Sequence, residues 1–324
     1  PRYNTMKNSV NIAIIGLGQI GIYLYNELRS KKKEIERKTG KKIIIAAISA
    51  KNKNKKRKFQ IQKNIFFKKP LQIFKKKKID ILFECIGLSD GISKKIVETA
   101  LKNKIHVITP NKALIAKHGD SLAKLAEINK VNLEFEASVA GGIPILRTIK
   151  EGLATNKINK VYGILNGTTN YILTKMQEDN MSFDEVLKIA KDKGFTSDQE
   201  SKLDIGGYDA AHKLTILSTL CFKSNLNFKN NYIEGISNIK VEDINYAEKL
   251  GYKIKLISEA CIIEDKISNF TSPKLVSMEN PLARVDNALN AINIETIHLE
   301  NLFLEGEGAG GKPTASSVLS DLYD

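Results

Sequence analysis

Residues 10–21 read Val-Asn-Ile-Ala-Ile-Ile-Gly-Leu-Gly-Gln-Ile-Gly, an apolar run that ends in three spaced glycines, Gly16, Gly18 and Gly21. The run is typical of a buried strand, and apolar residues at helical spacing then continue to about residue 40. A second apolar run at 43–48 predicts another strand. Strand, glycine turn, helix and strand form one βαβ unit, which predicts a parallel sheet.

Each glycine of this turn has a separate physical task in a dinucleotide site. Gly16 permits the tight turn, Gly18 lets the backbone approach a pyrophosphate, and Gly21 lets helix and strand pack closely. The helix that this turn opens offers unpaired N–H groups to the phosphates, and Gln19 and Ile20 of the turn are expected to contact the cofactor. A purely structural turn is the alternative, but the βαβ context favours a dinucleotide.

The rest of the chain divides into two kinds of pattern. Strands are expected at 79–86, 105–109 and 132–136, with helices at 93–102 and 120–130, which indicates a doubly wound parallel sheet. The lysine-rich stretch between them, 51–78, is expected to form loops and an edge element. Further on, helices at 183–193, 210–222 and 244–250 and strands at 160–165, 253–263 and 296–304 indicate a mixed α/β region. We therefore predict an α/β fold: a Rossmann-type nucleotide domain at 1–135, completed by 306–324, and a substrate and dimerisation domain at 136–305.

Composition excludes several other classes of protein. The chain has 324 residues, of which 42% are hydrophobic and 27% charged, so it can bury a core and is not disordered. It contains no apolar run long enough to cross a membrane and no signal-peptide pattern, so the cytoplasm is the expected location. The three cysteines, Cys85, Cys221 and Cys261, lie far apart in apolar surroundings and are expected to be reduced core residues.

Charge is unevenly distributed along the chain. Residues 1–130 contain 31 Lys and Arg against 9 Asp and Glu, a balance of +22, whereas residues 131–324 contain 20 against 27, a balance of −7. The basic half could attract nucleic acid or a phosphorylated cofactor. A lysine-rich composition of the whole proteome would explain the surface lysines equally well.

The end of the second predicted strand bears on the choice of cofactor. An NAD site places an acidic residue there to bind the ribose hydroxyls. Here the segment from Lys51 to Arg57 contains five cations in seven residues and no acid. A carboxylate would repel a 2′-phosphate and these side chains would attract it, so we expect NADP(H) to be preferred over NAD(H), with Lys51 and Arg57 as ligands.

Four longer motifs make the prediction more specific. They are Thr109-Pro110-Asn111-Lys112-Ala113-Leu114, Glu136–Pro144, Gly163–Tyr171 and Leu203–Lys213. In this order they resemble the homoserine dehydrogenase family, over nearly the whole chain from Gly16 to the Gly306–Gly311 loop. The resemblance implies reversible reduction of L-aspartate 4-semialdehyde to L-homoserine by NAD(P)H, a step in the biosynthesis of threonine, methionine and isoleucine.

The resemblance also implies a role for individual residues. Lys213 would donate and accept the proton, because its ammonium stabilises a developing alkoxide. Asp209 would hold Lys213, Asp204 would bind the substrate amino group, and Lys112 would reach the reaction centre from the nucleotide domain. Taken alone, Asp209 and Lys213 would be an ordinary i,i+4 surface pair. Gly167 and Thr168 complete the expected substrate site, and Gly87, Lys112 and Gly308 the expected cofactor site.

One segment departs from the family pattern. The family has an Ala-Glu-x-Asp-Pro stretch before the first aspartate, whereas residues 194–202 here read Gly-Phe-Thr-Ser-Asp-Gln-Glu-Ser-Lys, with one extra residue. Counting back from Asp204 places Asp198 at the position of the substrate-binding Glu and Glu200 at that of the Asp. Charge is kept but reach differs by one methylene, so substrate affinity is the property this change affects most.

The Glu136–Pro144 segment resembles the family's monovalent-cation site. The side chain of Glu136 and the carbonyls of Val139, Gly141 and Ile143 would hold sodium or potassium, although glycines that serve packing alone would give the same pattern. Family members pair through the substrate domain, which implies a homodimer. Many also carry a C-terminal regulatory domain that senses threonine; this sequence does not contain one, either truly or by truncation.

Four other functions can be weighed against the sequence. The nearest is another NADP-dependent reductase of a small aldehyde or hydroxy acid. A dehydrogenase that forms an acyl-enzyme would need an activated cysteine, and Cys85 lies in a predicted strand, a poor place for one. A nucleic-acid-binding protein would use the basic half, but no nucleic-acid-binding motif is present. A catalytically inactive sensor is disfavoured because Lys112, Asp204, Asp209 and Lys213 are all present.

Overall fold

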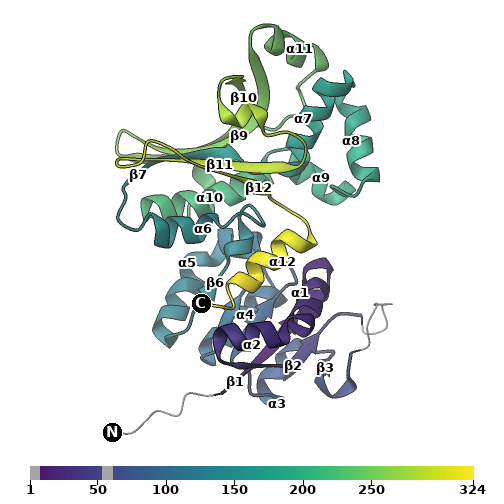
Figure 1. The fold of residues 1–324 in the computed structure, drawn as a ribbon, viewed down its shortest axis with the longest axis vertical. Coiled ribbons are helices and arrows are strands. Elements are labelled where there is room, and N and C mark those ends of the chain that lie inside the picture. Colours follow the sequence, from purple (N-terminus) through teal and green to yellow (C-terminus); the bar gives the residue numbers. More distant parts are fainter. Residues whose placement is uncertain (1–7, 53–60) are drawn as a thin grey trace. The chain divides into compact units, whose positions relative to one another are not determined.

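The computed structural model describes residues 8–52 and 61–324. The chain forms two compact units, the first made of residues up to Ser138 together with Thr314–Asp324, the second of Val139–Pro313. Each unit contains its own six-stranded sheet (Figure 1). Arg57, one of the expected phosphate ligands, lies outside the described residues.

The sheet of the first unit is parallel throughout, as the βαβ pattern predicts. Its strand order is β3-β2-β1-β4-β5-β6. The order reverses direction between β1 and β4, and in such sheets a ligand binds at the carboxyl ends of those two strands. The strands are β1 (Ser9–Ile15), β2 (Lys42–Ser49), β3 (Phe66–Phe67), β4 (Ile81–Glu84), β5 (His106–Ile108) and β6 (Leu133–Glu134).

Two of the expected helices in this unit differ from the structure. The single helix expected up to residue 40 is two, because Lys31 leaves the helical region with φ −95° and ψ 12°. The helix expected from 120 begins eight residues earlier, because the Asn111 side chain caps it by accepting a hydrogen bond from the Leu114 amide at 3.1 Å. The helices are α1 (Gln19–Ser30), α2 (Lys32–Thr39), α3 (Ile73–Lys76), α4 (Ile92–Lys102), α5 (Lys112–Asn129) and α12 (Gly311–Ser320), whose last seven residues belong to this unit.

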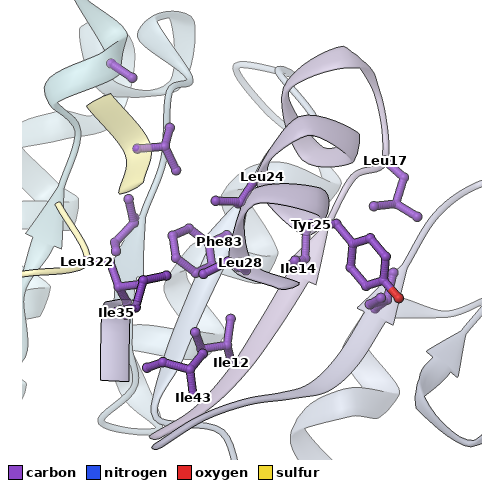
Figure 2. Close-up of a cluster of buried hydrophobic side chains, with 14 of the residues drawn as sticks. Ile12, Ile14, Leu17, Leu24, Tyr25, Leu28, Ile35, Ile43, Phe83 and Leu322 are labelled. Carbon is purple, nitrogen blue, oxygen red and sulfur yellow. The ribbon is translucent and has the colours of Figure 1, made fainter. Parts of the chain in front are cut away.

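A cluster of buried side chains holds α1 and α2 against the sheet. Leu24 and Leu28 of α1 pack with Ile14 of β1 and Phe83 of β4, and Leu322 from the end of the chain joins the same cluster (Figure 2). Burying an aliphatic side chain of this size stabilises the fold by about 1.5–3 kcal/mol. This core fixes the glycine turn, which connects β1 directly to α1.

The sheet of the second unit is mostly antiparallel. Its order is β12-β11-β7-β9-β10-β8, and only the β10–β8 pairing is parallel. The span 296–304, expected as one strand, contains the end of one strand, a turn at 297–301 and the start of the next strand at 302–304, because Thr296 exchanges hydrogen bonds with Leu299 and reverses the chain there. The strands are β7 (Ile158–Ile164), β8 (Asn231–Ile233), β9 (Tyr252–Ile263), β10 (Lys266–Ser277), β11 (Leu289–Thr296) and β12 (Leu302–Glu307).

The longest buried helix of this unit is α10, which packs against β7, β8, β9 and β10. Ten of its side chains are buried, and Asp209 and Lys213 are among them. The helices are α6 (Ile145–Arg147), α7 (Gly167–Asp179), α8 (Phe183–Asp192), α9 (Asp198–Ile205), α10 (Tyr208–Phe222) and α11 (Val241–Lys249).

Two general expectations can be compared with the described residues. None of the helices within 8–52 and 61–324 is both long and apolar enough to cross a membrane. All three cysteines are free thiols, as expected, but only Cys221 is fully buried.

Candidate functional site

A pocket of about 610 Å³ opens in the first unit at the carboxyl ends of β1, β2 and β4. The glycine turn forms one wall, with Gly16 at φ +100°, a conformation that side chains rarely adopt. A Cβ on Gly21 would lie 1.9 Å from the Gly16 oxygen, so that glycine permits the close packing of α1 on the turn. A Cβ on Gly18 would meet nothing within 4 Å, which leaves its backbone open to a ligand.

The expected cofactor residues occupy different places around this pocket. Gly16, Gly18 and Lys51 line it. Gln19, Ile20 and Gly21 form the first turn of α1, whose free amides begin there. The remaining ones lie elsewhere: Gly87 in the loop after β4, Lys112 at the start of α5, and Gly308 in the second unit.

Lys68 also lines the pocket, a residue that sequence reasoning assigned only to loops at the sheet rim. It follows β3, seventeen positions after Lys51, and both lysines border the same space. Pairing of β3 with the end of β2 brings the two segments together. The lysine-rich stretch 51–78 was the only signal, and it could not identify this residue.

Cys85 lies on the pocket wall beside the glycine turn. Burial raises the pKa of the Cys85 thiol, and the neighbouring Glu84 raises it further. Because the thiolate is the nucleophile, this environment does not activate Cys85. The expectation that it does not form an acyl-enzyme therefore agrees with its surroundings.

In the second unit, Lys213 is buried on α10 and makes two short polar contacts. Its Nζ lies 2.8 Å from Asp209 Oδ2, one turn earlier on the helix, and donates to the carbonyl of Leu165 at 2.7 Å. Both side chains are about nine-tenths buried, so this is not a surface ion pair. The expected pairing of Asp209 with Lys213 is therefore present in the structure.

Asn166 connects Asp209 with Asp204. Its amide nitrogen donates to Asp204 Oδ1 and to Asp209 Oδ2, each at 2.9 Å. Its side-chain oxygen accepts from the Thr169 amide and thereby caps α7. Sequence reasoning named its neighbours Gly167 and Thr168 but not Asn166, although Asn is among the residues most favoured at a helix N-cap.

Asp204 is held from the other side by Thr196, whose hydroxyl donates to Oδ2 at 2.8 Å. Burial raises the pKa of Asp204 above its usual range, and the charge of Asp209 adds to this rise. Hydrogen bonds from Thr196 and Asn166 and the charge of Lys213 act in the opposite direction. We call the four side chains Lys213, Asp209, Asn166 and Asp204 the lysine–carboxylate cluster.

The structure does not bring Asp198 to this cluster. Its side chain is 91% exposed and lies 2.8 Å from Lys191, whose ammonium holds the pKa of Asp198 below its usual range. Within segment 194–202, Ser197 caps α9 by accepting a hydrogen bond from the Glu200 amide at 3.3 Å. Thr168 is buried and donates its hydroxyl to the Phe195 carbonyl at 3.3 Å, and Gly167 begins α7.

The part of the expected cation segment that lies in the second unit, residues 139–144, turns sharply. Ala140 and Gly141 both have positive φ, and a Cβ on Gly141 would lie 2.6 Å from the backbone of Gly308. The Ile143 carbonyl already accepts from the Ile145 amide at 2.8 Å. Within the described residues, no group of three or more His, Cys, Asp or Glu side chains could hold a metal, so any cation site here would consist largely of carbonyl oxygens.

Comparison with known proteins gives a consistent assignment. Residues 16–136 match the family model "Homoserine dehydrogenase, NAD binding domain", and residues 144–323 match "Homoserine dehydrogenase". A homoserine dehydrogenase of Neisseria gonorrhoeae is 39% identical over 315 residues, which are 97% of this chain and 72% of that protein.

Solved structures agree with the sequence matches. The crystal structure of a homoserine dehydrogenase from Thiobacillus denitrificans superposes with a TM-score of 0.90 at 36% identity, covering 97% of this chain and 72% of that one. A hyperthermophilic archaeal homoserine dehydrogenase mutant in complex with NADPH has a TM-score of 0.79 at 26% identity, over 97% of this chain and 96% of that chain. On this evidence, the chain belongs to the homoserine dehydrogenase family of NAD(P)-dependent oxidoreductases.

Proposed function

We propose that the chain reduces L-aspartate 4-semialdehyde to L-homoserine reversibly, with Lys213 as the proton donor and acceptor. One observation carries the role of Lys213. Within the described part of the chain, its ammonium uses two N–H groups, on Asp209 and on the Leu165 carbonyl. An ammonium has three donors, so one is left for the substrate oxygen.

The cluster can support the proton transfer in three ways. Asp209 and the Leu165 carbonyl orient the ammonium, and burial strengthens its attraction for a developing alkoxide. Asn166 fixes both carboxylates, and Asp204 offers its remaining lone pairs to the substrate ammonium. NAD(P)H, when bound, supplies the hydride. We also propose that Lys112, which belongs to the first unit, takes part at the reaction centre.

The test of this role is Lys213→Met. Removing a general acid typically lowers turnover by about 10²–10⁴-fold, so kcat should fall by that order while the Kd for NADPH stays unchanged. Lys188→Met, at an exposed lysine of α8, is the matched control and should keep the parent kcat. Turnover of Lys213→Met close to the parent value would contradict the proposal.

We also propose that Lys51 and Lys68 bind the 2′-phosphate and give a preference for NADPH. Both line the pocket that contains the glycine turn, and a phosphate monoester there would gain two nearby cations. Arg57 remains a candidate for the same role on sequence grounds.

The double variant Lys51→Glu/Lys68→Glu tests this preference. Reversing both charges should raise the KM for NADPH by about tenfold or more and change the KM for NADH little, because NADH lacks the 2′-phosphate. Lys102→Glu/Lys124→Glu, at exposed positions of α4 and α5, changes the net charge equally and should leave the ratio of the two KM values unchanged. An unchanged ratio in the pocket variant would place the phosphate elsewhere.

Two further proposals concern ions and assembly. We propose that Glu136 and the carbonyls of Val139, Gly141 and Ile143 provide a site for sodium or potassium, supported by the sharp backbone turn at Ala140 and Gly141. Activity measured in sodium, potassium and tetramethylammonium salts tests it.

We propose a homodimer formed through the second unit, where large apolar side chains such as Leu250 and Leu275 are exposed. Sedimentation analysis gives the mass that decides this proposal.

A further inference from the structure

Glu84 is the last residue of β4 and is completely buried in the first unit. Its Oε1 accepts hydrogen bonds from the Ser93 hydroxyl at 3.0 Å and the Ile86 amide at 2.9 Å, with the Gly87 amide at 3.4 Å. These donors belong to residues 85–93, which comprise the loop after β4 and the first two residues of α4, Ile92 and Ser93; we call this segment the β4–α4 loop. One oxygen of Glu84 therefore fixes the path of this loop.

The other oxygen of Glu84 fixes a second loop. Oε2 accepts from the Thr109 hydroxyl at 2.8 Å and from the Asn111 amide nitrogen at 3.2 Å. Asn111 also donates to the Leu88 carbonyl at 2.8 Å and caps α5 through the Leu114 amide. Glu84 and Asn111 thus join the β4–α4 loop to the segment that begins α5 with Lys112.

All five groups around Glu84 are donors, and this fits only a side chain whose two oxygens both accept. An amide would turn its NH₂ group either towards the backbone amides of Ile86 and Gly87 or towards the Asn111 amide nitrogen. Either orientation places donor against donor in a buried site, which costs more than the loss of one exposed hydrogen bond.

The loops that Glu84 holds border the pocket. Ile86, Leu88 and Ile92 of the β4–α4 loop line it, and Lys112 follows Asn111 directly. We propose that Glu84 is a positioning residue for the nicotinamide cofactor, acting through Asn111 to hold the pocket wall and the start of α5. This inference rests on the proposed assignment of the pocket to the cofactor. It explains Thr109 and Asn111 of the Thr-Pro-Asn-Lys motif, to which the proposed reaction gives no role.

A second contact holds the same loop on the outside, and it provides a comparison. Asp90 lies 2.6 Å from Lys117 Nζ and 2.8 Å from His118 Nε2, both on α5. Asp90 and Lys117 are about half exposed, and exposed ion pairs contribute little to stability. The buried contact should therefore control the loop and the exposed one should not.

The experiment compares Glu84→Gln, Asn111→Ser and the double variant with two control variants. Asn111→Ser keeps a cap for α5 but is too short to bridge Glu84 and Leu88. Asp90→Asn removes the exposed contact, and Glu98→Gln changes one partly exposed carboxylate of α4 in the same unit. The KM for NADPH, NADH and aspartate 4-semialdehyde, kcat and the midpoint of thermal unfolding are measured for each.

Glu84→Gln and Asn111→Ser should each raise the KM for both cofactors by about tenfold, with less than about a twofold change in the KM for the semialdehyde. Because the two side chains act as one unit, the double variant should be little worse than either single one. The control variants Asp90→Asn and Glu98→Gln should keep the KM values of the parent.

Two outcomes would overturn the proposal. Variants that unfold at lower temperature but keep the parent KM values would give Glu84 a purely structural role, and additive effects of Glu84→Gln and Asn111→Ser would show that they act separately. If Glu84→Gln does not fold, the cofactor KM values and the unfolding midpoint of Asn111→Ser decide whether the contact is purely structural. A wrong pocket assignment is distinguishable, because Lys51→Glu/Lys68→Glu would then leave both cofactor KM values unchanged.

Discussion

At the residue scale, the site contains a carboxylate that destabilises the fold in its charged form. Burial raises the pKa of Asp204, with Asp209 adding to the effect, so the folded protein binds this proton more tightly than the unfolded chain. Stability therefore falls as the pH rises through the raised pKa. A charge retained at this cost is typical of a functional site.

Asp204→Asn tests this argument by removing the charge and keeping the shape. The new amide can accept from Asn166 at the position of Oδ1 and donate to the Thr196 hydroxyl at that of Oδ2. The variant should unfold at a higher temperature than the parent at neutral pH, while kcat/KM for the semialdehyde falls by about 10–100-fold through loss of a charged hydrogen bond.

The stability difference between Asp204→Asn and the parent should depend on pH in a definite direction. Below the ordinary pKa of Asp, about 3.9, the carboxyl is protonated in both states and the stability difference should vanish. It should grow as the pH rises through the raised pKa and then level off. Asp198→Asn, at the exposed carboxylate paired with Lys191, is the matched control, and its lowered pKa predicts the opposite sign. A difference for Asp204→Asn that does not depend on pH would exclude the charge as its cause.

Residues of the site could be predicted from the sequence where one element carries them together. Asp209 and Lys213 are four apart on one helix, so their contact follows from helical spacing alone. Asn166, Thr196 and Lys68 could not be found from helical spacing. They lie just after β7, just before α9 and just after β3, and only tertiary contacts bring them to their sites. Glu84 was equally hidden, since its partners lie up to 27 positions away.

At the element scale, strands with apolar runs were predicted and polar ones were not. The strands at 10–15 and 43–48 have continuous apolar sequences, and the structure contains both. β10 reads Lys-Ile-Ser-Asn-Phe-Thr-Ser-Pro-Lys-Leu-Val-Ser and was missed, because its polar residues and Pro273 hide the alternation. Pairing with β9 along its whole length stabilises this strand, which its own sequence does not predict.

Where a cap lay inside a motif, the sequence prediction placed the start of α5 too late and missed α7 altogether. Asn111 is the N-cap of α5 and Asn166 is the N-cap of α7, and both lie in segments whose resemblance to a family drew attention to their chemistry. Each of these asparagines caps a helix with its oxygen and donates to a buried carboxylate with its nitrogen. The first turn of each helix is therefore fixed to the carboxylate beside it, which a propensity argument does not contain.

At the scale of the whole molecule, the charge asymmetry belongs to the unit that holds the glycine turn. Residues 1–130 carry a balance of +22 and residues 131–324 a balance of −7. A pocket within a basic unit attracts anions over a distance that salt shortens, from about 10 Å at 0.1 M to about 3 Å at 1 M. NADPH has one phosphate more than NADH and so feels this field more strongly.

Salt should therefore weaken the binding of NADPH more than the binding of NADH. Between about 0.05 and 0.5 M potassium chloride, the KM for NADPH should rise more steeply than the KM for NADH, because the field acts on the additional phosphate. If the proposed sodium or potassium site is saturated over this whole range, kcat should change little, since Lys213 and Asp209 are buried and therefore weakly screened. In Lys51→Glu/Lys68→Glu the two slopes should become equal, whereas in Lys102→Glu/Lys124→Glu the difference should persist. Parallel slopes in the parent would mean that local contacts alone, without the field of the basic unit, determine the choice between NADPH and NADH.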